Sequence, residues 1–152
     1  MRIISSIQDA IDAVGSELGV SDWFAVDQDR INAFADATGD HQWIHVDVER
    51  ARAESPYLST IAHGFLTLSL IPGLSKANYR VDNAKMGINY GLNRVRFLTP
   101  VPAGGRVRLR SELVDAAKVN DTTVDLTVSQ TVELEGSVKP AAVAESIARM
   151  VF

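Results

Sequence analysis

Two hydrophobic patterns divide the chain. In the first half, apolar residues recur every three or four positions, which is typical of amphipathic helices. In the second half, polar and apolar residues alternate over long runs, which is typical of antiparallel strands with one face on a core and one in water. The order predicts an α+β protein, with short helices first and a long antiparallel sheet after them.

The N-terminal segment carries a helical pattern. Ser6 can cap a helix, and apolar residues follow at spacings of three and four, at Ile7, Ile11, Val14 and Leu18. This pattern predicts that residues 1–20 form an N-terminal helical extension. The apolar run 23–26 that follows indicates a short strand.

Two further helices have clear boundaries. Asp27 stands at an N-cap position, and Gly39 stands where a left-handed residue would end the same helix. Asp47 can cap a second helix over residues 48–54, which Ser55-Pro56 ends because a residue before proline avoids the α region. Asp40 is therefore expected on a turn just past a helix end.

The segment from Gly64 to Leu74 is apolar on nearly every face. A helix of this kind is expected to be buried all round. Pro72 is expected to kink or end it. This helix is the predicted centre of the fold.

The second half predicts strands over residues 89–98, 106–113 and 123–135. Asn120-Asp121 lies between the last two, so they are expected to form a hairpin. The tail from Ala141 to Phe152 is open to two interpretations: its alanines favour a helix, and a final strand would complete the sheet. A sheet with one apolar helix would leave an edge and a face uncovered, which favours dimerisation.

Composition narrows the class of protein. A length of 152 residues fits one domain with a real core. The net charge of -4 argues against a nucleic-acid partner, and the absence of cysteine excludes a thiolate nucleophile. We see no secretory signal pattern and no run long enough to span a membrane, so a cytoplasmic protein is expected.

The candidate catalytic groups are close in the sequence to two glycines, Gly39 and Gly64. Asp40 and His45 could act as a general acid/base pair sharing one water, or could be a turn cap and a packed histidine. Gly64 could offer its N–H to a developing negative charge, or could serve close packing at a helix start. His41 and His45 have the i, i+4 spacing of metal ligands, but Gly39 indicates a turn there, so no metal site is expected.

The order of these motifs resembles that of a known family. Gly39-Asp40-x-x-x-x-His45, then Ala62-His63-Gly64, then Asn93-Arg94-Val95-Arg96-Phe97 closely resemble the MaoC-like dehydratases, the (R)-specific enoyl-CoA hydratases of hot-dog fold. The likeness covers most of the chain, from about Trp23 onward. The family motif usually has Asn-Pro where this chain has Gln42-Trp43, a departure in the loop that keeps the glycine, aspartate and histidine.

The resemblance implies an antiparallel sheet wrapped around one buried central helix, with residues 1–152 as a single domain and the tail as a strand. It implies that Asp40 and His45 activate the water that adds to a trans-2-enoyl-CoA, while the Gly64 N–H receives the negative charge of the thioester oxygen. It implies no metal or redox cofactor and a homodimer. The substrate-binding candidates are Trp43, His63, Phe65, Arg94 and Arg96.

Three alternatives remain open on the sequence. The protein could be a (3R)-hydroxyacyl dehydratase acting on acyl-carrier-protein thioesters in fatty-acid synthesis. It could be an acyl-CoA thioesterase, although the Asp40 to His45 spacing favours hydration. It could also be a non-catalytic acyl-CoA-binding module, because a fold alone does not determine function.

Overall fold

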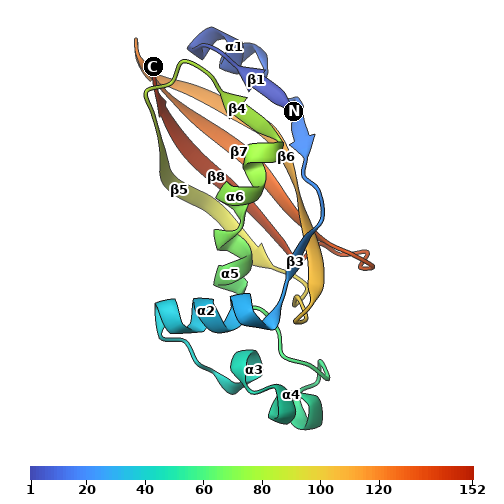
Figure 1. The fold of residues 1–152 in the computed structure, drawn as a ribbon. Helices are drawn as coiled ribbons and strands as arrows, with labels where there is room; N and C mark the ends of the chain where they lie inside the picture. The colour runs from blue at the N-terminus through green and yellow to red at the C-terminus, as the bar shows by residue number, and fades with distance from the viewer.

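The fold is one long antiparallel sheet with a helix across its inner face (Figure 1). A computed structural model describes residues 1–152. Its main sheet follows the order β2-β6-β7-β8-β5, and β3 also pairs with β6. The strands are β2 (Glu17–Val20), β3 (Phe24–Val26), β5 (Met86–Phe97), β6 (Gly105–Asn120), β7 (Thr123–Leu134) and β8 (Ala142–Val151). The central helix has two parts, α5 (Gly64–Ser69) and α6 (Ile71–Leu74).

The remaining elements gather at the two ends of the sheet (Figure 1). At one end lie α2 (Gln28–Thr38), α3 (Trp43–Val46) and α4 (Val48–Glu54). At the other lie β1 (Arg2–Ile4), α1 (Ile7–Asp12), the 3-10 turn η1 (Ser75–Ala77) and β4 (Tyr79–Val81), with β1 and β4 paired in parallel. None of the helices combines the length and apolar character needed to cross a bilayer.

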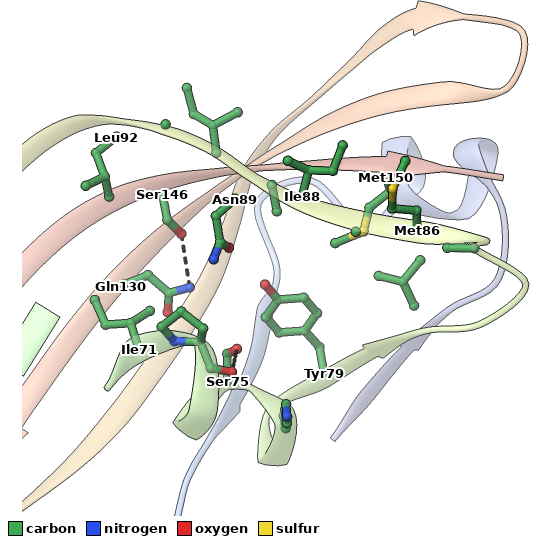
Figure 2. Close-up of a pocket in the computed structure, with 18 of the residues that line it drawn as sticks. Ile71, Ser75, Tyr79, Met86, Ile88, Asn89, Leu92, Gln130, Ser146 and Met150 are labelled. Carbon is green, nitrogen blue, oxygen red and sulfur yellow. Dashed lines mark hydrogen bonds between the residues drawn. The ribbon is translucent and has the colours of Figure 1, made fainter. Parts of the chain in front are cut away.

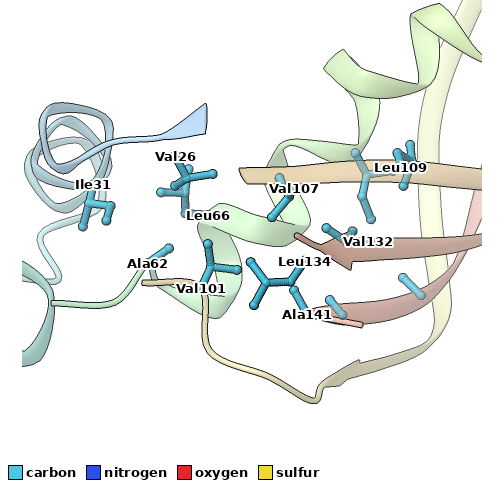
Figure 3. Packing of buried hydrophobic residues seen from close by; sticks show 13 residues of the cluster. Val26, Ile31, Ala62, Leu66, Val101, Val107, Leu109, Val132, Leu134 and Ala141 are labelled. Carbon is cyan, nitrogen blue, oxygen red and sulfur yellow. The ribbon is translucent and has the colours of Figure 1, made fainter. Parts of the chain in front are cut away.

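The core lies between the sheet and the helices. Figure 3 shows Leu66 of α5 among inward side chains of the sheet, including Val107 and Val132. A second cluster, around Leu113 and Leu126, packs under α1. Since β6 and β7 contribute to both clusters, the same two strands support both ends of the molecule.

This architecture confirms the expected α+β hot-dog fold, an antiparallel sheet around a central helix. The helix boundaries at Asp27 and Gly39 are also confirmed, since the Asp27 carboxylate accepts the Arg30 N–H at 2.9 Å and Gly39 has a φ of 78°. The tail is strand β8, paired with both β7 and β5, so sheet pairing overrides the helical propensity of its alanines.

The expected helical extension over residues 1–20 is wrong in extent. Ser6 does cap a helix, but that helix ends at Asp12. Gly15 then turns the chain with a φ of 83°, and its N–H donates to the Leu113 carbonyl. Leu18 therefore lies in β2, paired with β6, where sheet hydrogen bonding replaces the helical repeat.

The central helix is also less buried than its sequence predicts. Leu66 and Ile71 face the core, whereas the Phe65 side chain is 68% exposed. The sheet covers only one side of the helix, so its other apolar side is open in the single chain. The expected interruption near Pro72 is present, since the helix is divided at Leu70. Pro72 itself falls in the first turn of α6, where its missing N–H costs no hydrogen bond.

Candidate active site

Asp40 lies on the turn that leaves α2. Gly39 ends the helix in the left-handed conformation, so the next residue points away from the helix axis. The Asp40 side chain is exposed and accepts the Gln42 N–H at 3.3 Å. The loop thus presents a carboxylate to solvent, as the sequence predicts.

His45 lies in α3, a single helical turn where a non-helical turn was expected. Its side chain is only 7% exposed. The Nδ1–H donates to the Ile61 carbonyl at 2.7 Å, because a carbonyl only accepts, and this leaves Nε2 as the basic nitrogen of the neutral ring. Burial lowers the pKa of His45, and the positive charge that His63 would carry lowers it further. His45 is therefore held neutral at pH 7.

His63 contacts both Asp40 and His45. It is 3% exposed, and its Nε2–H donates to the main-chain oxygen of Asp40 at 2.9 Å. Its ring stacks on that of His45, with centroids 3.8 Å apart and planes at 24°. The His63 Nδ1 atom is buried and has no hydrogen-bond partner in the chain.

The carboxylate and the two imidazoles form one cluster. An oxygen of Asp40 and one ring nitrogen each of His45 and His63 lie within 4.8 Å of one another. These donors could in principle ligate a metal. The same groups can also hold one water, because the Asp40 carboxylate and a ring nitrogen of His45 can each accept a further hydrogen bond.

Gly64 begins α5 directly after His63. Its N–H donates no hydrogen bond within the chain, as expected for the first residue of a helix. A Cβ at this position would come within 2.8 Å of the Phe97 ring. Glycine therefore keeps the ring and the helix start in close contact, beside an N–H that can bind an anion.

His45 and Gly64 line the same cavity, which has a volume of about 330 Å³. Its other lining groups come mainly from the segments before α5 and after β5, among them Tyr57, Thr67, Phe97 and Thr99. The histidine of the predicted acid/base pair and the predicted N–H donor thus face one space, while Asp40 lies within 4.8 Å of that histidine without lining the cavity. Of the cavity-lining residues, only Gly64 and His45 were predicted to be site residues.

The structure separates the other candidate residues from this cavity. Trp43 packs against Arg50, with the guanidinium 4.2 Å from the ring centroid, and does not line the cavity. Phe65 makes an edge contact with Phe97 at 5.9 Å and is otherwise exposed. Arg94 and Arg96 alternate along β5 with the inward-facing Val95, so they project from the opposite face of the sheet.

Sequence reasoning missed Gln28. Its Nε2 donates to the His45 carbonyl at 2.8 Å, and its Oε1 accepts the hydroxyl of Thr60. The side chain thus connects the first turn of α2 to the backbone of His45 and to the side chain of Thr60. No local pattern indicates this role, because a glutamine at the start of a helix is an ordinary surface residue.

Together the fold and the site define a class: a hot-dog protein in which a carboxylate, two imidazoles and a helix-start N–H without a partner in the chain lie close to one cavity. The MaoC-like domain family matches residues 9–135, and the chain belongs to this family. It is accordingly an enzyme of the hydratase and dehydratase class, so the interpretation as a non-catalytic module is set aside.

Individual relatives agree with this assignment. The chain is 56% identical over 151 residues to 3-hydroxyacyl-thioester dehydratase Z of Mycobacterium tuberculosis strain H37Rv, covering 99% of each chain. A monoamine oxidase regulatory protein from Archaeoglobus has the same fold with a TM-score of 0.82 at 24% identity, covering 99% of this chain and 96% of that one. R-hydratase PhaJ1 of Pseudomonas aeruginosa superimposes with a TM-score of 0.69 at 22% identity, covering 89% and 79%.

Proposed function

We propose that this enzyme catalyses the (R)-specific addition of water to trans-2-enoyl-CoA, giving (3R)-hydroxyacyl-CoA, and the reverse dehydration. The observation that carries the proposal is the approach of Asp40 to His45, within 4.8 Å, next to the cavity that Gly64 lines. The name of the Mycobacterium tuberculosis relative, a 3-hydroxyacyl-thioester dehydratase, supports a thioester substrate.

The acid/base pair supplies the proton transfers. The neutral His45 ring and the Asp40 carboxylate hold one water between them, and the water oxygen bonds to Cβ of the enoyl group. The pair accepts the proton that this water loses and, by passing it between the two groups, returns one proton to Cα. Every proton removed is thus replaced, and the enzyme ends the cycle unchanged.

The helix start supplies the electrostatic stabilisation. As water adds to Cβ, negative charge moves onto the thioester oxygen. The N–H of Gly64 has no partner in the chain and Gly64 lines the cavity, so this N–H is available to such an oxygen. Donors fixed in place before the reaction stabilise the charge most effectively. The proposed reaction involves no net oxidation or reduction, so it requires no redox cofactor.

A second copy of the chain would complete the binding surface. Strand β5 is an edge of the main sheet, and several large apolar side chains on it are about half exposed: Met86, Ile88, Tyr90, Leu92 and Phe97. A long exposed apolar edge is a liability in a single chain. We therefore propose a homodimer in which β5 is covered, and treat residues 1–152 as the single domain of each protomer.

A dehydratase acting on carrier-protein thioesters is the second candidate. The arginines on β6 pair with carboxylates, as Arg106 does with Glu135, but Arg94 and Arg96 form no salt bridge. Two free cations at the edge of the sheet suit an acidic carrier protein or the phosphates of coenzyme A. Rates on CoA and carrier-protein thioesters of one acyl chain distinguish the two.

Hydration of crotonyl-CoA, followed by loss of enoyl absorbance, tests the proposal. Asp40→Asn and His45→Gln should each lower kcat about 10²–10⁴-fold, the usual cost of losing one acid/base partner. His41→Gln is the matched control, since His41 lies in the same loop but is exposed and paired with Asp36. Full activity in both site variants, or a (3S) product, contradicts the proposal.

A further inference from the structure

The one-turn helix α3 carries His45 but has little support of its own. It has four residues, and Gln42 before it forms no side-chain cap. Its last bond runs from the Asp47 N–H to the Trp43 carbonyl at 3.0 Å. A helix this short is unstable in isolation, because a single turn does not repay the cost of ordering its backbone. The position of His45 therefore depends on the contacts of α3 with its neighbours.

Two neighbours hold the middle of α3. The His45 carbonyl accepts the Gln28 amide at 2.8 Å, and the His45 ring donates to the Ile61 carbonyl at 2.7 Å. The Ile61 N–H in turn donates to the Ile44 carbonyl at 3.0 Å. None of these bonds reaches Trp43, so the first residue of the helix needs another contact.

That contact comes from α4, which follows α3 directly (Figure 1). The guanidinium carbon of Arg50 is 4.2 Å from the centroid of the Trp43 ring, a cation–π distance. The same guanidinium donates its Nε–H to Glu54 at 3.0 Å, which holds it over the ring. Asp47 makes the junction short, because it ends α3 and also caps α4 by accepting the Arg50 N–H at 3.0 Å. We call Trp43 and Arg50 the α3–α4 clamp.

We propose that Trp43 and Arg50 are positioning residues for His45. Their contact fixes the start of α3 against α4 and thereby keeps the His45 ring directed at the catalytic cavity. This role rests on the proposed function, in which His45 belongs to the acid/base pair. Neither clamp residue touches the reacting atoms, which differs from the substrate contact expected of Trp43 from the sequence.

The clamp lies outside both large cavities of the protein. The cavity of about 330 Å³ is lined by His45 but by neither clamp residue. The other cavity, of about 840 Å³, lies between α6, β4, β5 and β8, and Figure 2 labels no residue before Ile71 among its lining. Loss of the clamp should therefore displace His45 without removing a substrate contact, so kcat should change more than KM.

Amide hydrogen exchange tests the clamp without catalysis. The Ile61 N–H reports on α3, because it donates to the Ile44 carbonyl. In Arg50→Met this amide should exchange about two- to fivefold faster, the factor expected for losing an exposed cation–π contact, while the amides of β7 keep their rates. Arg52→Met is the matched control and should change neither: Arg52 lies in the same helix and pairs with Glu49 at 3.2 Å, but forms no cation–π contact.

Turnover of crotonyl-CoA measures the effect on the reaction. Arg50→Met and Trp43→Leu should each lower kcat about three- to tenfold and change KM less than about twofold, because a displaced acid/base group is costly. Since both act through one contact, the double variant should be no slower than the slower single variant. Unchanged kcat and amide exchange in both single variants, or effects that multiply in the double variant, overturn the proposal.

The variant Trp43→Pro should restore the constraint without Arg50. Gln42 has a φ of -55° and a ψ of 136°, which a residue before proline readily adopts, and the Trp43 N–H has no partner in the chain. Proline fixes φ near its helical value at the first position of a helix, so kcat of Trp43→Pro should stay within about twofold of the unaltered enzyme. Adding Arg50→Met should then have no effect. A Trp43→Pro variant with an unchanged melting temperature but the low rate of Trp43→Leu overturns the proposal.

The positioning role and the proposed function fail separately. An unaltered protein that does not hydrate crotonyl-CoA contradicts the proposed function, and faster exchange of the Ile61 amide in Arg50→Met would still support the clamp. Normal turnover, with kcat and exchange insensitive to Arg50→Met, overturns the positioning role alone.

Discussion

The ring of His63 stacks on that of His45 at 3.8 Å while its Nε2–H binds the main-chain oxygen of Asp40 at 2.9 Å. One buried side chain therefore sets the positions of both members of the proposed acid/base pair. In the sequence, His63 was a substrate-binding candidate beside Gly64. The contacts assign it a positioning role instead.

Replacing His63 should separate its two contacts. His63→Phe keeps a ring against His45 but loses the bond to Asp40, and kcat should fall about tenfold because small displacements of catalytic groups are costly. The change also removes the coulombic effect of His63 that lowers the pKa of His45, so the acid limb of the rate profile should move to higher pH. A fall in kcat without this movement would mean that the ring only supports the fold.

The pH dependence of the unaltered enzyme follows from the state of His45. Burial lowers its pKa below the ordinary value of histidine, so the ring stays neutral as pH falls through the usual range. The same shift adds folding stability that is present above the ordinary pKa and lost as pH falls through the lowered one. We expect kcat/KM on crotonyl-CoA to decline only below the usual histidine range. A fall in kcat/KM that begins above pH 7 would contradict the lowered pKa of His45.

Gln28 should act on the rate through the backbone of His45. Gln28→Glu can still accept the Thr60 hydroxyl but no longer donates to the His45 carbonyl. We expect a fall in kcat of about tenfold with little change in KM. Gln8→Glu, on the exposed helix α1, is the control and should leave both constants unchanged. Equal effects of the two variants would remove Gln28 from the site.

The two glycines of the central helix should respond in opposite ways to alanine. In Gly64→Ala the new Cβ meets the Phe97 ring at 2.8 Å, so we expect a loss of about 1–3 kcal/mol in stability and a lower rate. In Gly73→Ala the methyl meets nothing within 4 Å, and helix propensity should add about 0.5–1 kcal/mol. Thermal melting and crotonyl-CoA turnover test both; equal responses would show that the contact with Phe97 is unimportant.

Local signals in the sequence were enough for much of the fold. Asp27, Gly39 and Asp47 define helix ends through bonds within a few residues, and the alternation over residues 123–135 reports a face that is buried along its whole length. These features depend on residues that are close in the sequence, so they can be read from the sequence directly. The approach of Asp40 to His45 is also local in origin, because only a short loop and the single-turn helix α3 separate the two residues.

The sequence predictions that differ from the structure, and the contact that they missed, have a different physical origin. Leu18 follows a helical spacing but lies in a strand, because pairing with β6, almost a hundred residues later, outweighs local preference. The Arg94 and Arg96 side chains face away from the cavity because of strand register, which no motif reports. The bond from Gln28 to His45 joins residues 17 apart and depends on how α2 meets α3.

The place of β8 has a consequence for how the polypeptide matures. This strand lies between β7 and β5, although it follows β5 in the chain by more than forty residues. Until β8 has been translated, β5 has no neighbour in the sheet. The sheet therefore cannot close before then, and the nascent protein keeps a bare strand that chaperones would be expected to cover.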